Sequence, residues 1–518
     1  MTDARVNDKV RTGIEGLDAI LLGGITRLNN VLVEGAPGAG KTTLGLGFIL
    51  AGAVLYDEPG LIVSFELDAA KLIRDAKGFN WDLKALVEDG RVKIIHATPM
   101  AILKEFRAPD SVLMEHIEKL GVKRLMIDGL TPLKLYAEAN QLPFREDLHA
   151  LIEDLTAHQV TTFVTCEREE QQSFGHERYV FDTIISLTRH ETRRRVSRRL
   201  TIEKSRGQDF IGGSHAMELV AGVGVRVYRR AQSRPKADDT QPTSSTRISS
   251  GISILDAMMD GGLYAGSVTL VTGISGTGKT VAGVQFLCES ARQGRRGVLV
   301  SLDEHPAQLI RNANSLSLGL GDLVERGMIT LVYDSPLELD LDVHFDQLAR
   351  LVEEKQIECI VFDSVAVYEM TNHEEAADYL YALATFCKNR LITAYFNYES
   401  PELLGVSQIS EELKGSHLVD NILLLSYVEI STRLRRAISV PKVRGSRNVQ
   451  ETREYTIREG GISILDGTGE STAQDVPQLP FSAYYGLLSR SPTRHSPAIE
   501  EAITHGAPLP EDAAPGKD

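Results

Sequence analysis

The sequence is poor in cysteine and tryptophan and contains no long apolar run. Its 518 residues include four cysteines and one tryptophan. No two cysteines form a C-x-x-C pair, which argues against both a zinc site and a disulfide framework. We expect all four to be reduced core residues: Cys166, Cys288, Cys359 and Cys387. Residues 1–5 have no apolar signal core and no stretch approaches the roughly 18 apolar residues of a membrane span, so a cytoplasmic protein is expected.

An excess of positive charge is also missing. The formal net charge of −15 argues against a chain built mainly to hold nucleic acid. Residues 189–199 are rich in arginine, but they lack interleaved aromatics and fall at an expected hairpin between two strands. A solvated turn or a contact between subunits is favoured there over RNA or DNA binding.

What the sequence does contain is a phosphate-binding motif that occurs twice. Residues 35–42 and 273–280 both fit G-x-x-x-x-G-K-[ST], each after an apolar strand-like run and before an amphipathic segment. With the residue that follows each motif, the candidate nucleotide-binding residues are Gly35, Ala36, Pro37, Gly38, Ala39, Gly40, Lys41, Thr42 and Thr43, and Gly273, Ile274, Ser275, Gly276, Thr277, Gly278, Lys279, Thr280 and Val281. Two copies in matching contexts exclude a chance match.

Each residue type in the motif has a chemical reason. Glycines let the backbone close on an anion, and Lys41 and Lys279 can reach the outer phosphates. The hydroxyls of Thr42 and Thr280 suit a Mg²⁺ ligand. The motifs therefore predict two sites for a nucleoside triphosphate with Mg²⁺.

Carboxylates end the strands that follow each motif. Asp128 and Asp363 end apolar runs at the position that holds Mg²⁺, usually through water. Glu66 and the pair Asp303 and Glu304 end an earlier strand, where a carboxylate can polarise the group that attacks the γ-phosphate, and Asp303 is also a candidate metal ligand. A solvated acid at a strand end is the alternative, and repetition beside a phosphate loop favours function.

The order of these segments indicates the fold. Residues 11–25 and 247–263 suggest a short helix and a Gly-Gly turn ahead of the first core strand. Alternating strands and helices predict an α/β protein with mainly parallel sheets covered on both faces, and the later strands predict an antiparallel end.

The motif spacing predicts two tandem domains. Lys41 and Lys279 lie 238 residues apart, too far for a solenoid period. The expected division is a first domain at 1–231, a polar linker at 232–246, a second domain at 247–468 and a flexible C-terminal tail at 469–518.

Two Lys-x-Arg-Gly segments close the domains. Lys204 and Arg206, like Lys442 and Arg444, project from one face of a strand and could grip phosphate oxygens. They lie far in sequence from their own loops, so a neighbouring subunit's nucleotide is a candidate ligand. An ordinary solvated edge strand is the alternative.

With these residues assembled, the chain resembles the KaiC family of double-domain P-loop ATPases, which are related to RecA and hexameric helicases. The resemblance covers roughly residues 8–468 and includes the run 420–429. It implies two tandem RecA-like domains, ATP and Mg²⁺ as cofactors, and a homo-oligomer, a double-ring hexamer with the Lys-x-Arg pairs contacting the neighbour's ATP. It also implies slow ATP hydrolysis in the first ring and autokinase with autophosphatase activity in the second. A KaiA-like, KaiB-like or other signalling partner could bind the C-terminal tail.

The chain departs from the family at its acids. Family members carry adjacent glutamates after the second core strand, which correspond to Asp303 and Glu304 in the second domain but to Glu66 and Leu67 in the first. First-domain hydrolysis then depends on whether Glu66 substitutes.

Two further positions depart as well. The family's Ser-Thr phosphorylation pair corresponds to Ser416 and His417, so Ser416 is the one phosphorylation candidate of that pair. The family's aromatic near adenine corresponds to Phe79 in the first domain and to Leu316 in the second.

These observations favour a Mg-ATP-dependent ATPase whose second domain passes the γ-phosphoryl group to water or to Ser416 and which acts as an oligomeric switch of the signalling or clock type. One alternative is an ATP-gated scaffold with little catalysis. The other is a RecA-like or helicase-like DNA motor, which salt-dependent stimulation by single-stranded DNA would support.

Overall fold

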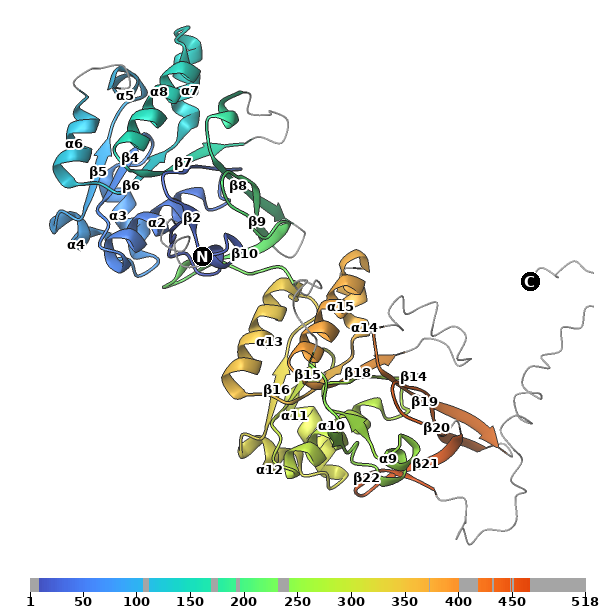
Figure 1. The fold of residues 1–518 in the computed structure, drawn as a ribbon. Helices are drawn as coiled ribbons and strands as arrows, with labels where there is room; N and C mark the ends of the chain where they lie inside the picture. Colours follow the sequence, from blue (N-terminus) through green and yellow to red (C-terminus); the bar gives the residue numbers. More distant parts are fainter. Residues whose placement is uncertain are drawn as a thin grey trace, which may run out of the picture.

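The computed structural model divides into two α/β bodies of similar construction (Figure 1). It describes residues 9–105, 111–168, 176–191, 196–231, 242–371, 373–399, 418–430, 433–447, 449 and 451–465. Ser416, the whole predicted tail at 469–518 and residues 232–241 of the predicted linker lie outside this part of the chain.

The first body is built on a nine-stranded sheet in the order β11-β10-β9-β8-β3-β7-β6-β4-β5. Its strands are β3 (Asn30–Gly35), β4 (Gly60–Ser64), β5 (Val92–His96), β6 (Arg124–Asp128), β7 (Thr161–Glu167), β8 (Thr183–Glu191), β9 (Val196–Ser205), β10 (Ser214–Val220) and β11 (Gly224–Val227). Its main helices are α2 (Lys41–Leu55), α3 (Ala69–Lys77), α4 (Leu83–Glu88), α5 (Pro99–Glu105), α6 (Val112–Leu120), α7 (Leu130–Ala139) and α8 (Phe144–Ala157).

The second body repeats this sheet in the order β16-β15-β17-β18-β14-β19-β20-β21-β22. Its strands are β14 (Val268–Gly273), β15 (Gly297–Ser301), β16 (Ile329–Tyr333), β17 (Cys359–Asp363), β18 (Thr393–Glu399), β19 (Asn421–Ile430), β20 (Arg433–Val443), β21 (Thr452–Arg458) and β22 (Gly461–Ile464). Its helices include α10 (Lys279–Arg292), α11 (Pro306–Ser315), α12 (Leu320–Glu325), α13 (Leu341–Lys355), α14 (Ala366–Thr371) and α15 (His373–Asn389).

The predicted change from parallel to antiparallel pairing is confirmed. In the first sheet β8 is still parallel to β3, and the antiparallel part begins with β9. In the second, β19 is parallel to β14 and β20 is antiparallel to β19. Each sheet therefore has a parallel half, where carboxyl ends of strands gather at one edge, and an antiparallel half.

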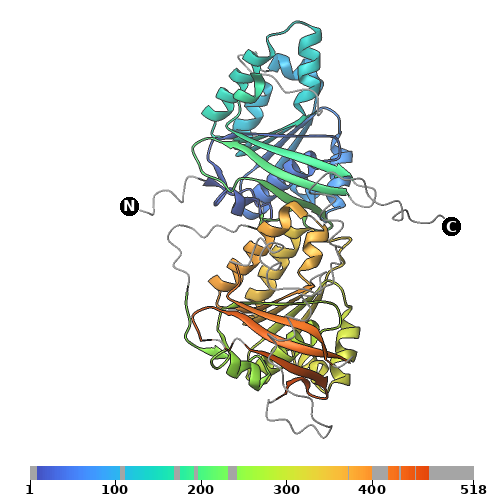
Figure 2. The ribbon, with the colours of Figure 1, turned by 90° about the vertical axis from the view of Figure 1, so that its right-hand side faces the viewer.

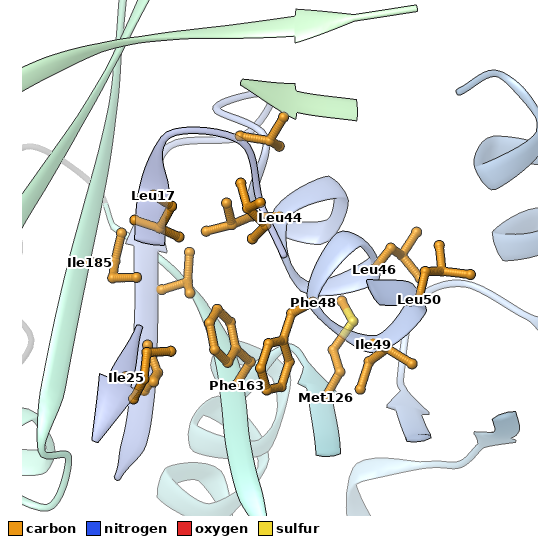
Figure 3. Packing of buried hydrophobic residues seen from close by; sticks show 14 of the residues in the cluster. Leu17, Ile25, Leu44, Leu46, Phe48, Ile49, Leu50, Met126, Phe163 and Ile185 are labelled. Carbon is orange, nitrogen blue, oxygen red and sulfur yellow. The ribbon is translucent and has the colours of Figure 1, made fainter. Parts of the chain in front are cut away.

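Apolar side chains cover both faces of each sheet, as predicted for parallel strands. In the first domain one face packs against α2, where Phe48 stacks on Phe163 of β7 with 4.1 Å between ring centroids (Figure 3). The opposite face packs under α6 and α8 around Leu125 and Leu148. This packing fixes α2, and hence the loop that precedes it, against the central strands.

The predicted leaders are also confirmed. The short helices α1 (Leu17–Ile20) and α9 (Ser253–Met258) precede paired glycines with positive φ, and the first core strand follows. Asp18 accepts from the backbone N–H of Thr12 at 2.8 Å, and Asp256 accepts from that of Ser250 at the same distance. The leader carboxylates thus hold the same turn in both domains.

The burial of the cysteines and the position of the arginine-rich hairpin agree with the prediction from the sequence. The four cysteines are free and buried. Across the described residues, no helix combines the length and the apolar character of a bilayer span. The arginine-rich residues flank a β8–β9 hairpin as predicted, but residues 192–195 at its tip lie outside the description.

Candidate nucleotide sites

The first phosphate loop joins β3 to α2 through left-handed glycines. Gly38 has φ of 75° and Gly40 has φ of 105°, a region that L side chains rarely adopt. At Gly35 a Cβ atom would lie 2.4 Å from the carbonyl oxygen of Leu187 on β8. The motif glycines are therefore required by the backbone path and by the neighbouring strand.

The second loop, between β14 and α10, repeats these constraints. Gly276 and Gly278 have φ of 81° and 99°. A Cβ atom on Gly273 would lie 2.2 Å from the Leu425 carbonyl oxygen, and one on Gly278 would lie 2.6 Å from Cδ1 of Ile457. Both loops end at a helix N-terminus, whose free N–H groups and dipole favour an anion.

The two motif lysines fold over their loops. Nζ of Lys41 donates to the carbonyl oxygens of Gly35 at 2.8 Å and Ala36 at 3.1 Å. Nζ of Lys279 makes the equivalent bonds to Gly273 at 2.8 Å and Ile274 at 3.0 Å.

Burial lowers the pKa of both lysines, and nearby acids oppose that shift, Glu167 and Asp128 in the first site and Glu399 and Asp363 in the second. Phosphate oxygens would offer these partly desolvated ammonium groups a stronger partner than carbonyls do.

A threonine and a strand-end aspartate meet beside each lysine. Oγ1 of Thr42 lies 3.1 and 3.3 Å from the carboxylate oxygens of Asp128. In the second site Thr280 hydrogen-bonds Asp363, which also accepts from Nδ2 of Asn397 at 3.0 Å. The sequence predicted that these hydroxyls and carboxylates meet, and the structure brings them together in both domains.

The aspartates fit a divalent cation. Burial raises the pKa of both Asp128 and Asp363, because each carboxylate is desolvated and only partly compensated by hydrogen bonds and its lysine. Oδ1 of Asn397 is buried next to Asp363 and has no partner within the described chain. Among the described residues no cluster of three or more His, Cys, Asp or Glu side chains forms a metal cage. The donor set suits Mg²⁺, which binds through one or two protein groups, phosphates and water.

The two domains differ at the turn after β4 and β15. The backbone N–H of Leu67 donates to Oγ of Ser64 at 3.2 Å, and that of Glu304 donates to Oγ of Ser301 at 3.1 Å. The turns are equivalent, but Leu67 packs on the core and Glu304 is a half-buried carboxyl group.

Glu304 is held in a specific electrostatic setting. Its pKa is raised by desolvation first and then by the charges of Asp363 and Asp303, while a hydrogen bond from Asn312 at 3.1 Å opposes the shift. Asp303 and its first-domain counterpart Glu66 are both exposed. Glu66 lies near enough to Lys41 for its negative charge to oppose the lowering of the lysine's pKa.

The Lys-x-Arg pairs lie away from their own loops. Nζ of Lys204 donates to the carbonyl of Phe181 at 2.6 Å, and that of Lys442 donates to Val419 at 2.8 Å. Arg206 and Arg444 are exposed next to Asp182 and Asp420 at 3.6 and 3.7 Å. All of them sit where β8 and β19 begin, at the edge opposite the phosphate loops.

The aromatic candidate and its second-domain counterpart both lie just after the helix that follows the second core strand. Phe79 lies just after α3 and is tilted against Trp81 at 5.2 Å between ring centroids. In the second domain Leu316 follows α11, and its carbonyl accepts from Gly460 in the turn between β21 and β22. The second domain therefore has an aliphatic side chain, Leu316, at the position where the first domain has the aromatic ring of Phe79.

Two groups of site residues were missed from the sequence. The first is the polar pair Thr165 and Asn397, which bond to Asp128 and Asp363 from the next strand of each sheet. Parallel pairing places Thr165 opposite Asp128 and Asn397 opposite Asp363. Both residues lie two positions before the Glu that ends their strand, and this repeated position could have identified them from the sequence.

The second is an ion-pair cluster under the first loop alone. Glu34, which precedes Gly35, is fully buried and accepts from Arg168 at 2.8 Å and from Arg178 at 3.0 Å. Both arginines also pair with Glu203 on β9, and the second domain has Thr272 where the first has Glu34. Because the partners come from distant segments, no local pattern marks them.

Two phosphate loops, each with a lysine, a threonine and a buried aspartate at the carboxyl edge of a mixed sheet, define a chain of two tandem RecA-like P-loop NTPase domains. The family model described as "ATPase: KaiC" matches residues 10–232 and 248–469. The chain is 32% identical to the circadian clock oscillator protein KaiC of Picosynechococcus sp. over 499 residues, covering 94% of this chain and 92% of that protein. It is also 32% identical to KaiC 1 of Synechocystis sp. over 501 residues, with the same coverage of both chains. The chain belongs to the KaiC family of P-loop ATPases.

Proposed function

We propose that this protein is a Mg-ATP-dependent oligomeric switch of the signalling or clock type, in which the second domain carries the more complete phosphoryl-transfer chemistry. The observation that carries the proposal is Glu304: a carboxyl group with a raised pKa occupies the turn where the first domain has Leu67. A general base needs a pKa near the working pH and a place beside the attacking group.

Each residue of the second site has a role in this proposal. Lys279 would hold the γ-phosphate, and Thr280 and Asp363 would hold Mg²⁺. Asp303, at the end of the neighbouring strand, would be a further ligand of the metal. When bound, Mg²⁺ would neutralise charge on the β- and γ-phosphate oxygens. Asn397 keeps the Asp363 carboxylate oriented.

Glu304 then takes a proton from the attacking hydroxyl as the bond from the γ-phosphorus to ADP breaks. Water as the attacking group gives free phosphate, and a serine hydroxyl gives a phosphoserine. The autokinase part of the proposal rests on the resemblance at Ser416, which lies outside the described residues.

The opposite-edge position of the Lys-x-Arg pairs supports an oligomer. Neither pair can reach its own phosphate loop, whereas a head-to-tail neighbour could present them to an adjacent site. We propose a ring, a hexamer by family resemblance, with the tail available to a KaiA-like, KaiB-like or other signalling partner.

A scaffold role is the second candidate for the first domain. Leu67 supports it, because a phosphate loop without a second acid can bind ATP and hydrolyse it slowly. ATP at this domain would then serve mainly to assemble the ring.

Incubation of the full chain with γ-labelled Mg-ATP tests the proposal when free phosphate and protein-bound label are followed together. We expect free phosphate, and label that is lost in Ser416→Ala, if the second domain is an autokinase. Phosphate without label would leave a plain ATPase. Neither product, with ATP still bound, would replace the proposal by the scaffold.

The fall of the turnover rate at acid pH, the acid limb of the pH profile, should depend on the environment of Glu304. Its base form is lost as pH falls through its raised pKa, so turnover should decline at a higher pH than for an ordinary Glu. Asp303→Asn removes a charge that raises this pKa and should move the limb to lower pH. Asn312→Ala removes a hydrogen bond that lowers it and should move the limb the other way. Assays of both variants over a range of pH measure the two shifts, which should have opposite signs. Shifts of the same sign would show that Glu304 is not the group whose protonation lowers turnover at acid pH.

A further inference from the structure

A mostly buried ion pair joins the two domains. Arg199 on β9 of the first domain donates from Nη1 to Asp342 at 2.6 Å and from Nη2 to Asp340 at 3.2 Å in the second. The three side chains are 23%, 10% and 7% exposed, so solvent screens the contact little. In both views the gold helices of the second domain, α13 among them, lie below the green antiparallel strands of the first domain (Figure 1, Figure 2).

The residue before Arg199 contacts the first phosphate loop. Nε of Arg198 donates to the carbonyl oxygen of Gly38 at 3.2 Å. Successive strand residues point to opposite faces, so β9 presents one arginine to the loop and the next to the other domain. The second domain keeps the first contact, from Arg436 to Gly276 at 3.4 Å, but has buried Ala437 in the place of Arg199.

On the second-domain side, the ion pair meets the first turn of α13. Asp340 is the N-cap of that helix and accepts from the N–H of Asp342 at 3.2 Å. Asp342 also accepts from the N–H of Ala231, where the described part of the first domain ends, at 3.2 Å. The orientation of this turn therefore depends on charge supplied by the first domain.

Polar contacts of the buried His344 side chain link α13 to α14, which begins three residues after Asp363. His344 lies two residues after Asp342; its Nδ1 is 2.7 Å from Asp334, and its Nε2 is 3.0 Å from the hydroxyl of Tyr368. Tyr368 is fully buried on α14, five residues after Asp363. Between them the N–H of Val365 donates to the carbonyl of Asn397, whose side chain bonds Asp363.

We propose that Arg199 is a positioning residue that couples occupancy of the first phosphate loop to the geometry of the second metal site. This inference rests on the proposed function, since it requires ATP at the first loop. Phosphate binding fixes Gly38, Arg198 transfers that constraint to β9, and Arg199 transfers it to α13. His344 and Tyr368 then carry it to the segment after Asp363.

Amide hydrogen exchange of the full chain in a Lys279→Ala background tests this coupling, because only the first loop then binds Mg-ATP. We expect ATP to protect the N-terminus of α2 and, with Arg199 present, to slow exchange in α13 and α14 by about five-fold or more. In Arg199→Gln the protection of α2 should remain while that of α14 is lost. Arg199→Lys, which keeps the charge, should restore part of it.

Arg350→Gln is the matched control. Arg350 also lies on α13 and bridges the domains, through Glu15 at 2.8 Å, but it contacts neither β9 nor the phosphate loop. Its loss should leave the α14 response intact. Protection of α2 without any response in α14, or an α14 response that survives Arg199→Gln, overturns the coupling; absence of protection at α2 overturns ATP binding there and the coupling with it.

Discussion

Glu304→Gln should abolish second-domain turnover while leaving Mg-ATP bound. Removing a general base typically costs about 100-fold to 10,000-fold in rate. The amide keeps the shape of the side chain and its hydrogen bond to Asn312, but it cannot take a proton from the attacking hydroxyl. Lys279, Thr280 and Asp363 remain in place, so nucleotide affinity should change little. Free phosphate and equilibrium binding, measured on the same preparation, separate the two effects.

The controls lie in the same domain and in the equivalent turn. Glu325→Gln makes the same change at an exposed acid that ends α12 and should leave turnover intact. Glu66→Gln tests whether the first domain uses its one acid at this turn. Phosphate release that persists in Glu304→Gln but disappears in the double variant would be catalysed by the first domain with Glu66. Full turnover in Glu304→Gln would assign the base to another residue.

Much of the two sites was predictable because their signals are local and repeated. Gly35 and Gly273 are fixed by a short motif, and the strand-end aspartates follow at similar distances in both halves, 87 residues after Lys41 and 84 after Lys279. A parallel sheet then forces these distant segments to one edge, so the pattern alone places Thr42 beside Asp128. The repeat identified these site residues, because each candidate in one half could be compared with the equivalent position in the other half.

Features that depend on long-range partners could not be predicted in this way. Arg199 and Asp342 are 143 residues apart and belong to different domains, so the arginine-rich segment suggested only a turn or a subunit contact. The edge strands β5 and β16 were missed from the sequence, and they differ from the central strand β14 in burial: most of their residues are half-buried, whereas all of β14 is buried. Whether a strand lies at the edge of a sheet depends on which segments pack beside it, and the local sequence does not contain that information.

The second large effect is expected at Arg444. Asn421, at the start of β19, pairs with Thr269 near the beginning of β14, whereas the phosphate loop starts at Gly273. Four residues of strand span about 13 Å, so Arg444 and its own loop lie at opposite edges of the sheet. If a neighbour's Arg444 stabilises charge on the phosphoryl group, Arg444→Ala should slow turnover by about 1,000-fold or more.

Mixed oligomers distinguish a contact in trans from a contact in cis. Arg444→Ala chains keep Glu304, and Glu304→Gln chains keep Arg444, so neither variant alone forms a complete site. In rings assembled from equal amounts of both, about one quarter of head-to-tail interfaces would combine an intact Glu304 with an intact Arg444. Turnover should therefore return to about one quarter of the unmodified rate when the chains are mixed before assembly. A mixture that stays as inactive as its components would place Arg444 in its own subunit's chemistry or outside the reaction, and it would remove the main support for an interfacial site.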